Sequence, residues 1–316
     1  MRSNNVLGFI FAATLDDKIP ELASSRTTAS VPIGGKYRII DFDLSNMSNS
    51  GISNVGIVAK SNFQSLMDHV GSGSAYDLSK RRSNLSILPP YDGKAFSSFV
   101  ETIYNMHGYI EHCREEYVLI SQGNVITNID YTDVFDFHSK KKADITLIYK
   151  NHAIPQGYDR PITLDVDNDG KVNQIFVKPG VVDKGVFNHA YGSILIKKDL
   201  LMSEIRNAIS VNQLDVRRLI QSSLGKYSIY AYENKGYCAA ISSINDYFEF
   251  NMDLMKKEVR DELFNPQRPI YTKVRDDAPS RYGLTSNVKN SIIAQGCVIN
   301  GEVENLSLIH ISEPTR

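Results

Sequence analysis

Three aspartates at alternating positions, Asp165, Asp167 and Asp169, are followed by a glycine and copy the opening of an EF-hand calcium loop. Such a loop requires a bidentate carboxylate at its twelfth position, where this chain has Phe176. The segments on either side, ITLDV and KVNQIFV, alternate apolar and polar residues around the turn. This pattern predicts a β-hairpin rather than a calcium site.

A second group of charged residues lies in the segment VPIGGKYRIIDFDLSNMSNSGI. Asp41 and Asp43 are close together along the helix expected there, so they could be mistaken for a catalytic pair of carboxylates. Their position near the helix start favours a cap and a charge on the solvated face. The preceding Gly-Gly pair predicts a tight turn, after which Tyr37 and Arg38 would start the helix.

Several common site types are missing from the sequence. The histidines show no HxxxH or HExxH pairing, there is no GxSxG motif, and Cys113, Cys238 and Cys297 lie too far apart for metal-ligand spacing. Without an export signal or a long apolar run, the chain is expected in the reducing cytoplasm, with no membrane span. Its net charge of -1 favours neither nucleic acid nor a membrane surface as a partner.

The segment VPIGGKYRIIDF, together with LSNMSNSGI, resembles the bacterial glucose-1-phosphate adenylyltransferases (ADP-glucose pyrophosphorylases) of glycogen synthesis. The resemblance covers nearly the whole chain, to about Asn305. Met47, where the catalytic subunits more often carry cysteine, favours the D-type subunit, which is thought to be regulatory. In the reaction that the resemblance implies, glucose 1-phosphate attacks the α-phosphate of Mg-ATP and pyrophosphate leaves.

Two positions at which this family carries magnesium-binding aspartates are changed. Asn124, in GNVITNIDY, replaces the first, and Ala240, in GYCAAISS, replaces the second. Because Mg²⁺ needs carboxylate oxygens, no metal is expected in this chain, and Mg²⁺ is expected in a catalytic partner. The family's phosphate loop GGxGxRL is also lost, since residues Ala13 to Ile19 put side chains and two carboxylates where phosphates would approach.

Parts of the sugar-phosphate side are retained. Lys178 matches a lysine that the resemblance places on the sugar phosphate, although a solvated lysine at a strand end is an equally good interpretation. Arg26 keeps its family position, whereas Val177 replaces a glutamate that would bind sugar hydroxyls. Sugar-phosphate binding is therefore expected to be weakened. The resemblance also implies that Lys36, and with it Arg38, lies near an allosteric effector site.

These features predict a subunit of ADP-glucose pyrophosphorylase that makes little or no product itself. It would assemble with a C-type catalytic subunit into a hetero-oligomer, expected to be a tetramer, and alter the partner's rate and effector response. Sugar phosphates and nucleotides are the candidate ligands. Two alternatives stay open: a catalytically active adenylyltransferase, and a free-standing sensor of sugar phosphates or nucleotide sugars.

Apolar runs alternate with helical patterns over residues 1–256, which predicts an α/β domain. The resemblance specifies a nucleotidyltransferase-type, Rossmann-like mixed sheet with helices on both faces. The runs expected as strands are Val6–Ala13, Val55–Ala59, Tyr117–Ile120 and Ile145–Tyr149. The segments expected as helices are Ile39–Met47, Phe99–Cys113, Val134–Lys141, Leu200–Ile209 and Tyr247–Lys256.

The end of the chain changes in character. Residues 257–286 are charged and proline-bearing, as expected of a linker. Over residues 287–307, apolar residues recur between Asn and Gly, which favours the start of a left-handed parallel β-helix, with a plain β-hairpin as the alternative. Because such coils need stacked neighbours, we expect only the beginning of that domain here. Residues 308–316 fit neither pattern and are interpreted as an artefactual tail.

Overall fold

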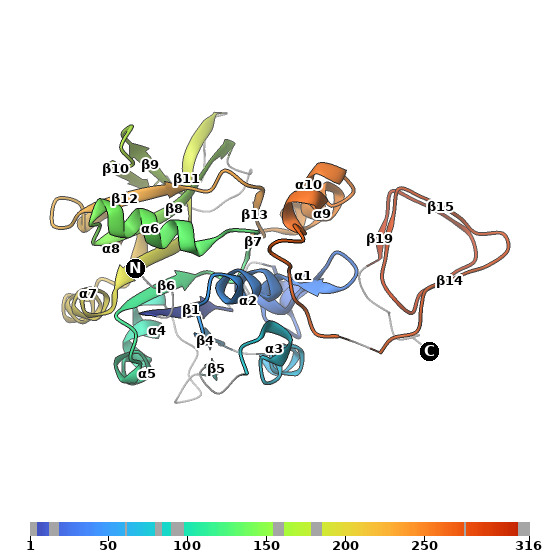
Figure 1. Ribbon diagram of the computed structural model, residues 1–316, viewed down its shortest axis with the longest axis horizontal. Coiled ribbons are helices and arrows are strands. Elements are labelled where there is room, and N and C mark those ends of the chain that lie inside the picture. The colour runs from blue at the N-terminus through green and yellow to red at the C-terminus, as the bar shows by residue number, and fades with distance from the viewer. Residues whose placement is uncertain are drawn as a thin grey trace.

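The computed structural model describes residues 5–12, 19–60, 62–79, 84–89, 98–153, 161–177, 185–274 and 276–308. Three sequence predictions therefore lie outside the described residues. They are the altered phosphate loop at 13–19, of which only Ile19 is described, Lys178, and the tail at 308–316, of which only Leu308 is described. The rest of the chain builds a nine-stranded mixed sheet, flanked by helices, and a small coil of short strands at the C-terminal end (Figure 1).

The first half of the sheet is parallel, as its apolar sequence predicts. Strand β1 (Val6–Phe11) lies between β4 (Asn54–Val58) and β6 (Tyr117–Ser121), and β5 (Asn84–Leu88) extends the sheet beyond β4. Every residue of β1 is buried, because helices cover both faces of the sheet. The expected strands in this half are therefore confirmed.

The second half is mostly antiparallel. Strand β11 (Val186–Lys197) pairs antiparallel with β6, with β8 (Ile145–Ala153) and with β9 (Ile162–Val166). Strand β12 (Ile229–Glu233) pairs in parallel with β8. The sheet as a whole is therefore mixed. The predicted hairpin is confirmed, since β9 pairs antiparallel with β10 (Val172–Val177). Asp167 closes its turn by accepting hydrogen bonds from two backbone N–H groups, at 2.9 Å each.

Helices cover both faces of the sheet (Figure 1). One apolar cluster holds Leu7 and Phe9 of β1, and the other holds Val6 and Ile10, so alternate residues of one strand serve the two faces. The helices of the first cluster are α4 (Phe99–Asn105), α5 (His107–His112), α7 (Lys198–Ser210) and α8 (Val216–Ser222). Those of the second are α2 (Ile39–Asn49), α3 (Gln64–Val70) and α6 (Tyr131–Lys141).

The single helix expected over Phe99–Cys113 is two helices. Met106 ends α4 with φ -92° and ψ 8°, and α5 starts at the next residue. Gly108, a poor helix former, follows the break.

A third apolar cluster lies beneath a hairpin formed by β2 (Pro32–Ile33) and β3 (Tyr37–Arg38). It includes residues of α9 (Ile244–Asp253) and Leu263 of α10 (Lys257–Leu263), which is fully buried. Helix α1 (Pro20–Ala23) precedes this region. The stretch expected as a linker thus begins with a helix that packs on the α/β part, whereas the domain boundaries themselves stay predictions.

The short C-terminal strands pair in parallel. Each of the first three strands pairs with the strand that follows it by one coil. The pairs are β14 (Arg281–Tyr282) with β17 (Val298–Ile299), β15 (Asn287–Lys289) with β18 (Glu302–Glu304), and β16 (Ile292–Ile293) with β19 (Ser307–Leu308). A plain β-hairpin would pair neighbouring strands antiparallel, so that alternative is wrong. The left-handed β-helix stays a prediction. Among the described residues, no helix is both long and apolar enough to cross a bilayer.

Candidate functional site

The two positions expected to have lost metal-binding aspartates lie next to each other. Asn124 directly precedes β7 (Val125–Thr127), and Ala240 ends β13 (Cys238–Ala240). The two strands pair antiparallel with Val125 opposite Ala240. In addition, the N–H of Ile241 donates to the carbonyl oxygen of Asn124 at 2.9 Å.

Neither residue supplies a charged ligand at this place. The Asn124 side chain is 1% exposed and donates from Nδ2 to the Ile241 carbonyl oxygen at 3.2 Å, while Oδ1 has no hydrogen-bond partner among the described residues. Ala240 is buried in an apolar cluster with Val125 and Tyr191. Because Mg²⁺ binds through carboxylates and waters, one amide oxygen beside an apolar cluster does not fit it. Within the described ranges, no group of three or more His, Cys, Asp or Glu residues is placed to hold a metal ion.

Tyr191, which packs against Ala240, belongs to a group of stacked aromatic side chains. The ring of Tyr191 on β11 stacks on that of His152 on β8 with centroids 5.2 Å apart, and the Tyr191 hydroxyl lies 2.5 Å from His152 Nε2. His189 stacks on the same imidazole at 5.5 Å. Burial lowers the pKa of His152, and it lowers the pKa of His189 to about 3, so both rings are neutral at pH 7. This cluster therefore adds bulk but no charge.

Asp41 is a cap, as predicted, but it is completely buried. Its Oδ2 accepts a hydrogen bond from the backbone N–H of Arg38 at 2.9 Å. Its Oδ1 accepts from the Tyr76 hydroxyl and from Nε2 of His69, both at 2.6 Å. Neither Tyr76 nor His69 was singled out from the sequence, because the segments that carry them show no marked pattern. Their common partner only becomes visible in the fold.

Asp43 is also buried, so the expectation of solvated-face charges on this helix is wrong. Helix α2 is buried from Ile39 to Met47, because it packs between the sheet and the third apolar cluster. The Ser121 hydroxyl donates to Asp43 Oδ1 at 2.6 Å, and Oδ2 has no partner among the described residues. Burial raises the pKa of Asp43 to about 7.

The glycine pair makes the tight turn that the sequence predicts. Gly34 and Gly35 have φ values of 57° and 77°, a region that favours glycine, and they join β2 to β3. Tyr37 and Arg38 form β3, and the helix begins only at Ile39, which corrects the predicted start. Arg38 is buried, and its guanidinium donates to the carbonyl oxygen and the hydroxyl of Ser65, at 2.6 and 2.8 Å.

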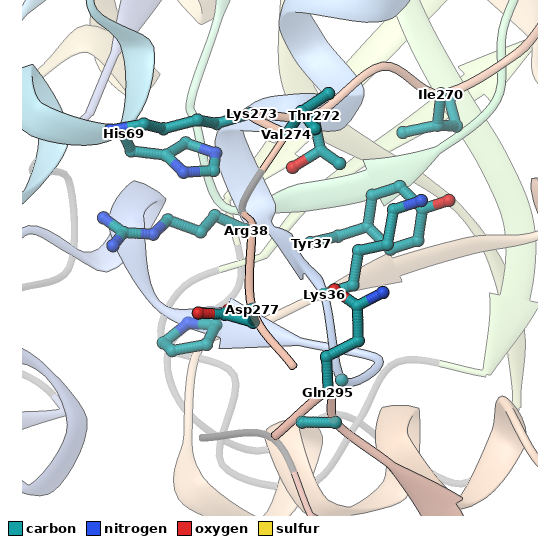
Figure 2. A pocket seen from close by; sticks show the side chains of 13 residues that line it. Lys36, Tyr37, Arg38, His69, Ile270, Thr272, Lys273, Val274, Asp277 and Gln295 are labelled. Atoms are coloured by element: carbon teal, nitrogen blue, oxygen red, sulfur yellow. The ribbon is translucent and has the colours of Figure 1, made fainter. Parts of the chain in front are cut away.

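A cavity of about 240 Å³ lies where this turn meets the C-terminal coil (Figure 2). Its walls are the β2–β3 turn, His69 of α3, the connection after α10 and the segment after β16. Three cationic side chains and one carboxylate line it: Lys36, Arg38, Lys273 and Asp277. Lys36 is exposed, with its ammonium 5.3 Å from the centroid of the Tyr37 ring. The two residues expected near an effector site thus line one cavity.

The remaining sugar-side residue, Arg26, lies apart from this cavity. Arg26 is half-buried and lies in the chain before α2. Burial of Tyr247 raises the pKa of that hydroxyl to about 12, and the positive charge of Arg26 offsets part of this rise. Tyr247 belongs to α9 and donates to the Pro32 carbonyl oxygen at 2.8 Å. The structure therefore associates Arg26 with α9.

Comparison with known proteins places these observations in a family. The profile of the nucleotidyl transferase family matches residues 17–257. The chain is 37% identical to the glycogen biosynthesis protein GlgD of Geobacillus stearothermophilus over 96% of this chain and 79% of that protein. It is 30% identical to GlgD of Bacillus subtilis (strain 168), over 100% and 83% of the two chains. It is also 30% identical to a glucose-1-phosphate adenylyltransferase of Clostridium acetobutylicum, over 96% and 82%.

Proposed function

The chain belongs to the nucleotidyl transferase family, and from this premise we propose that it is a regulatory subunit of glucose-1-phosphate adenylyltransferase in glycogen biosynthesis. It forms little or no ADP-glucose itself. In the cytoplasm it assembles with a C-type catalytic subunit and changes that subunit's rate and effector response. Its two stacked C-terminal coils belong to a left-handed β-helix.

The observation that carries this proposal is the absence of a carboxylate at two adjoining positions, Asn124 and Ala240. The two backbones are hydrogen-bonded neighbours, yet neither side chain is a carboxylate, and Ala240 packs against Tyr191 and Val125. Nucleotidyl transfer needs Mg²⁺ to neutralise the triphosphate and to organise the displacement. A site with two fewer negative charges and an apolar wall does not support that step.

The cavity at the β2–β3 turn supports a regulatory role. It lies between the α/β part and the C-terminal coil, so a ligand there touches both. Its cationic lining suits sugar phosphates or nucleotides. A ligand that binds one arrangement of the two parts more tightly shifts the population toward that arrangement, which is how an effector acts at a distance.

The proposal is tested by measuring ADP-glucose formation while a purified C-type subunit is titrated with this protein. We expect no product from this protein alone and a saturable change in the partner's rate or effector sensitivity. Product from this protein alone would establish an active adenylyltransferase. If neither quantity changes, the free-standing sensor becomes the better explanation, and ligand-induced stabilisation of the chain alone would identify it.

A further inference from the structure

An open hollow of about 660 Å³ lies beside β12, and its described lining shares no residue with the cavity at the β2–β3 turn. Its walls are α6, the turn between β9 and β10, the end of β12 with the segment that follows, and the chain around α10. Strand β12 contacts both α6 and β10, which brings these walls together (Figure 1). The volume lies within the range of about 300–1,000 Å³ that small-molecule sites occupy.

The hollow lies at the far end of the β7–β13 pair from the two changed metal positions. Asn124 precedes β7 and Asn128 follows it, whereas Gly236 precedes β13 and Ala240 ends it. Because the two strands are antiparallel, Asn128 and Gly236 lie at the same end of the pair, and both line the hollow. The hollow is therefore separate from Asn124 and Ala240.

A buried amide at the wall lacks one partner. Asn128 is 7% exposed, and its Nδ2 donates to the carbonyl oxygens of Leu263 and Arg268, at 2.8 and 2.9 Å. These two bonds fix the orientation of the amide, and Oδ1 has no hydrogen-bond partner among the described residues. A buried acceptor without a partner costs about 1–3 kcal/mol. A ligand that donates a hydrogen bond to Oδ1 removes this penalty.

The charged side chains of the hollow divide into two sets. Those of the first set have partners within the chain: Asp130 caps α6, Asp167 closes the β9–β10 turn, Lys141 pairs with Asp169, and Glu262 accepts from the Tyr237 N–H. Those of the second set make no hydrogen bond or ion pair among the described residues, and they are Asp133, Glu233, Lys235 and Arg268. The groups that a ligand would find unpaired are thus balanced in charge.

This balance disfavours an ionic ligand of either sign. Carboxylates outnumber cations in the whole lining, which repels an anion such as a nucleotide. A cationic ligand would meet the unpaired charges of Lys235 and Arg268 in the same hollow. An apolar ligand would remove the four unpaired charges from water without giving them partners. A neutral ligand with many polar groups meets none of these objections.

Aromatic rings supply the apolar part of the lining. Phe137 of α6 and Tyr232 of β12 meet edge to face with centroids 5.6 Å apart, and Tyr149 of β8 lines the same hollow. The hydroxyls of Tyr149 and Tyr232 make no hydrogen bond among the described residues. Burial and the charge of Asp133 raise the pKa of Tyr232, so its hydroxyl keeps its proton at neutral pH and can donate it.

These groups together suit the hydroxyls and the ring face of a sugar. Each sugar hydroxyl both donates and accepts, so neighbouring hydroxyls can donate to Asp133 or to Asn128 Oδ1 while they accept from Arg268. Hydrogen bonds to charged side chains are stronger than those between neutral groups. The C–H face of a sugar ring is apolar and packs against an aromatic ring.

We propose that this hollow binds a neutral oligosaccharide of glucose, through the rings of Phe137 and Tyr232 and the polar side chains of Asn128, Asp133 and Arg268. The ligand class rests on the lining alone, whereas the choice of glucose units rests on the proposed role in glycogen biosynthesis. A glucan chain bound here holds the protein beside the polymer and leaves the cavity at the β2–β3 turn free for an effector.

Maltoheptaose is the probe, in calorimetric titrations of the full chain without a catalytic partner. Binding should be saturable and should not change between about 0.05 M and about 0.5 M NaCl, because salt does not screen a neutral ligand. Asp133→Ala and Tyr232→Ala should each weaken it about tenfold or more. Asp136→Ala is the matched control, since Asp136 is an exposed acid of the same helix outside the hollow, and it should bind as the unmodified chain.

Asp133 is exposed, so Asp133→Ala should keep the fold even if Tyr232→Ala does not, and circular dichroism checks this. Absence of saturable binding, or equal affinities of Asp133→Ala and Asp136→Ala, would overturn the inference. Spermidine tests the rival occupant: salt-sensitive binding of spermidine without binding of maltoheptaose would assign the hollow to a cation instead. Failure to bind sugar leaves the regulatory proposal standing, and a failed titration with the C-type subunit leaves the sugar site standing.

Discussion

Ser121 donates a hydrogen bond of 2.6 Å to the buried carboxylate of Asp43, and it is the only hydrogen-bond partner of that side chain among the described residues. The hydroxyl does not compensate for the lost hydration, because burial still raises the pKa of Asp43 from 3.8 to about 7. Between these values the unfolded chain has lost the Asp43 proton while the folded chain retains it. Stability contributed by Asp43 is thus present below about pH 4 and is lost as pH rises to about 7.

Asp43→Asn should therefore stabilise the protein at neutral and alkaline pH. The gain above pH 7 is at most about 4 kcal/mol, since each unit of pKa shift corresponds to about 1.4 kcal/mol, and it should vanish near pH 4. Urea unfolding at about pH 4.5 and pH 8 measures it. Asp136→Asn, at an exposed acid, is the control and should change neither value much. A loss of stability at both pH values would contradict this account of Asp43.

Returning the two aspartates should not return catalysis. Asn124→Asp with Ala240→Asp places a carboxylate in the cluster of Val125 and Tyr191, and we expect destabilisation of about 2–4 kcal/mol with no ADP-glucose formed. Adding Tyr191→Met should relieve part of that loss by opening space. Chemical unfolding and a product assay with Mg-ATP test both statements. Turnover by the double variant would show that Tyr191 leaves room for substrate.

The two cations expected near an effector site should behave differently. Arg38→Ala removes a buried guanidinium and leaves the Ser65 carbonyl oxygen without its donor, which should cost about 2–3 kcal/mol. Lys36→Ala, at an exposed side chain, should leave stability within about 0.5 kcal/mol. Its effect should appear in the effector response of the hetero-oligomer. Equal loss of stability in the two variants would contradict a structural role for Arg38 that Lys36 does not share.

Gly35 should tolerate a side chain less well than a comparable glycine. Gly35 has a positive φ of 77°. A Cβ added there would lie 3.3 Å from the Ile292 side chain and 3.5 Å from the backbone of Ala294. Gly225 has a closely similar φ of 79°, but a Cβ there would have nothing within 4 Å. Gly225→Ala should cost about 1 kcal/mol from backbone strain alone, and Gly35→Ala should cost more. Equal unfolding energies would mean that the coil yields to the added methyl group without cost.

The sheet was predictable from the sequence because its strands are continuous apolar runs such as VLGFIF, which only a doubly covered sheet can bury. The β9–β10 hairpin was predictable from alternation around its turn. The burial of Asp43 was not predictable, because the residues of a short helix do not reveal that other parts of the chain cover both of its sides. Nor was the Asp41–His69 pair, since α3 is short and its contact with α2 is tertiary.

The pairing of β1 sets the order in which this protein can form. Val6 of β1 pairs with Tyr117 of β6, so the sheet cannot close until more than a third of the chain has been made. At a synthesis rate of roughly 5–20 residues per second, β1 waits several seconds for that partner. During this interval β1 can pair with β4 on one side, but its other edge is unpaired and exposed to aggregation.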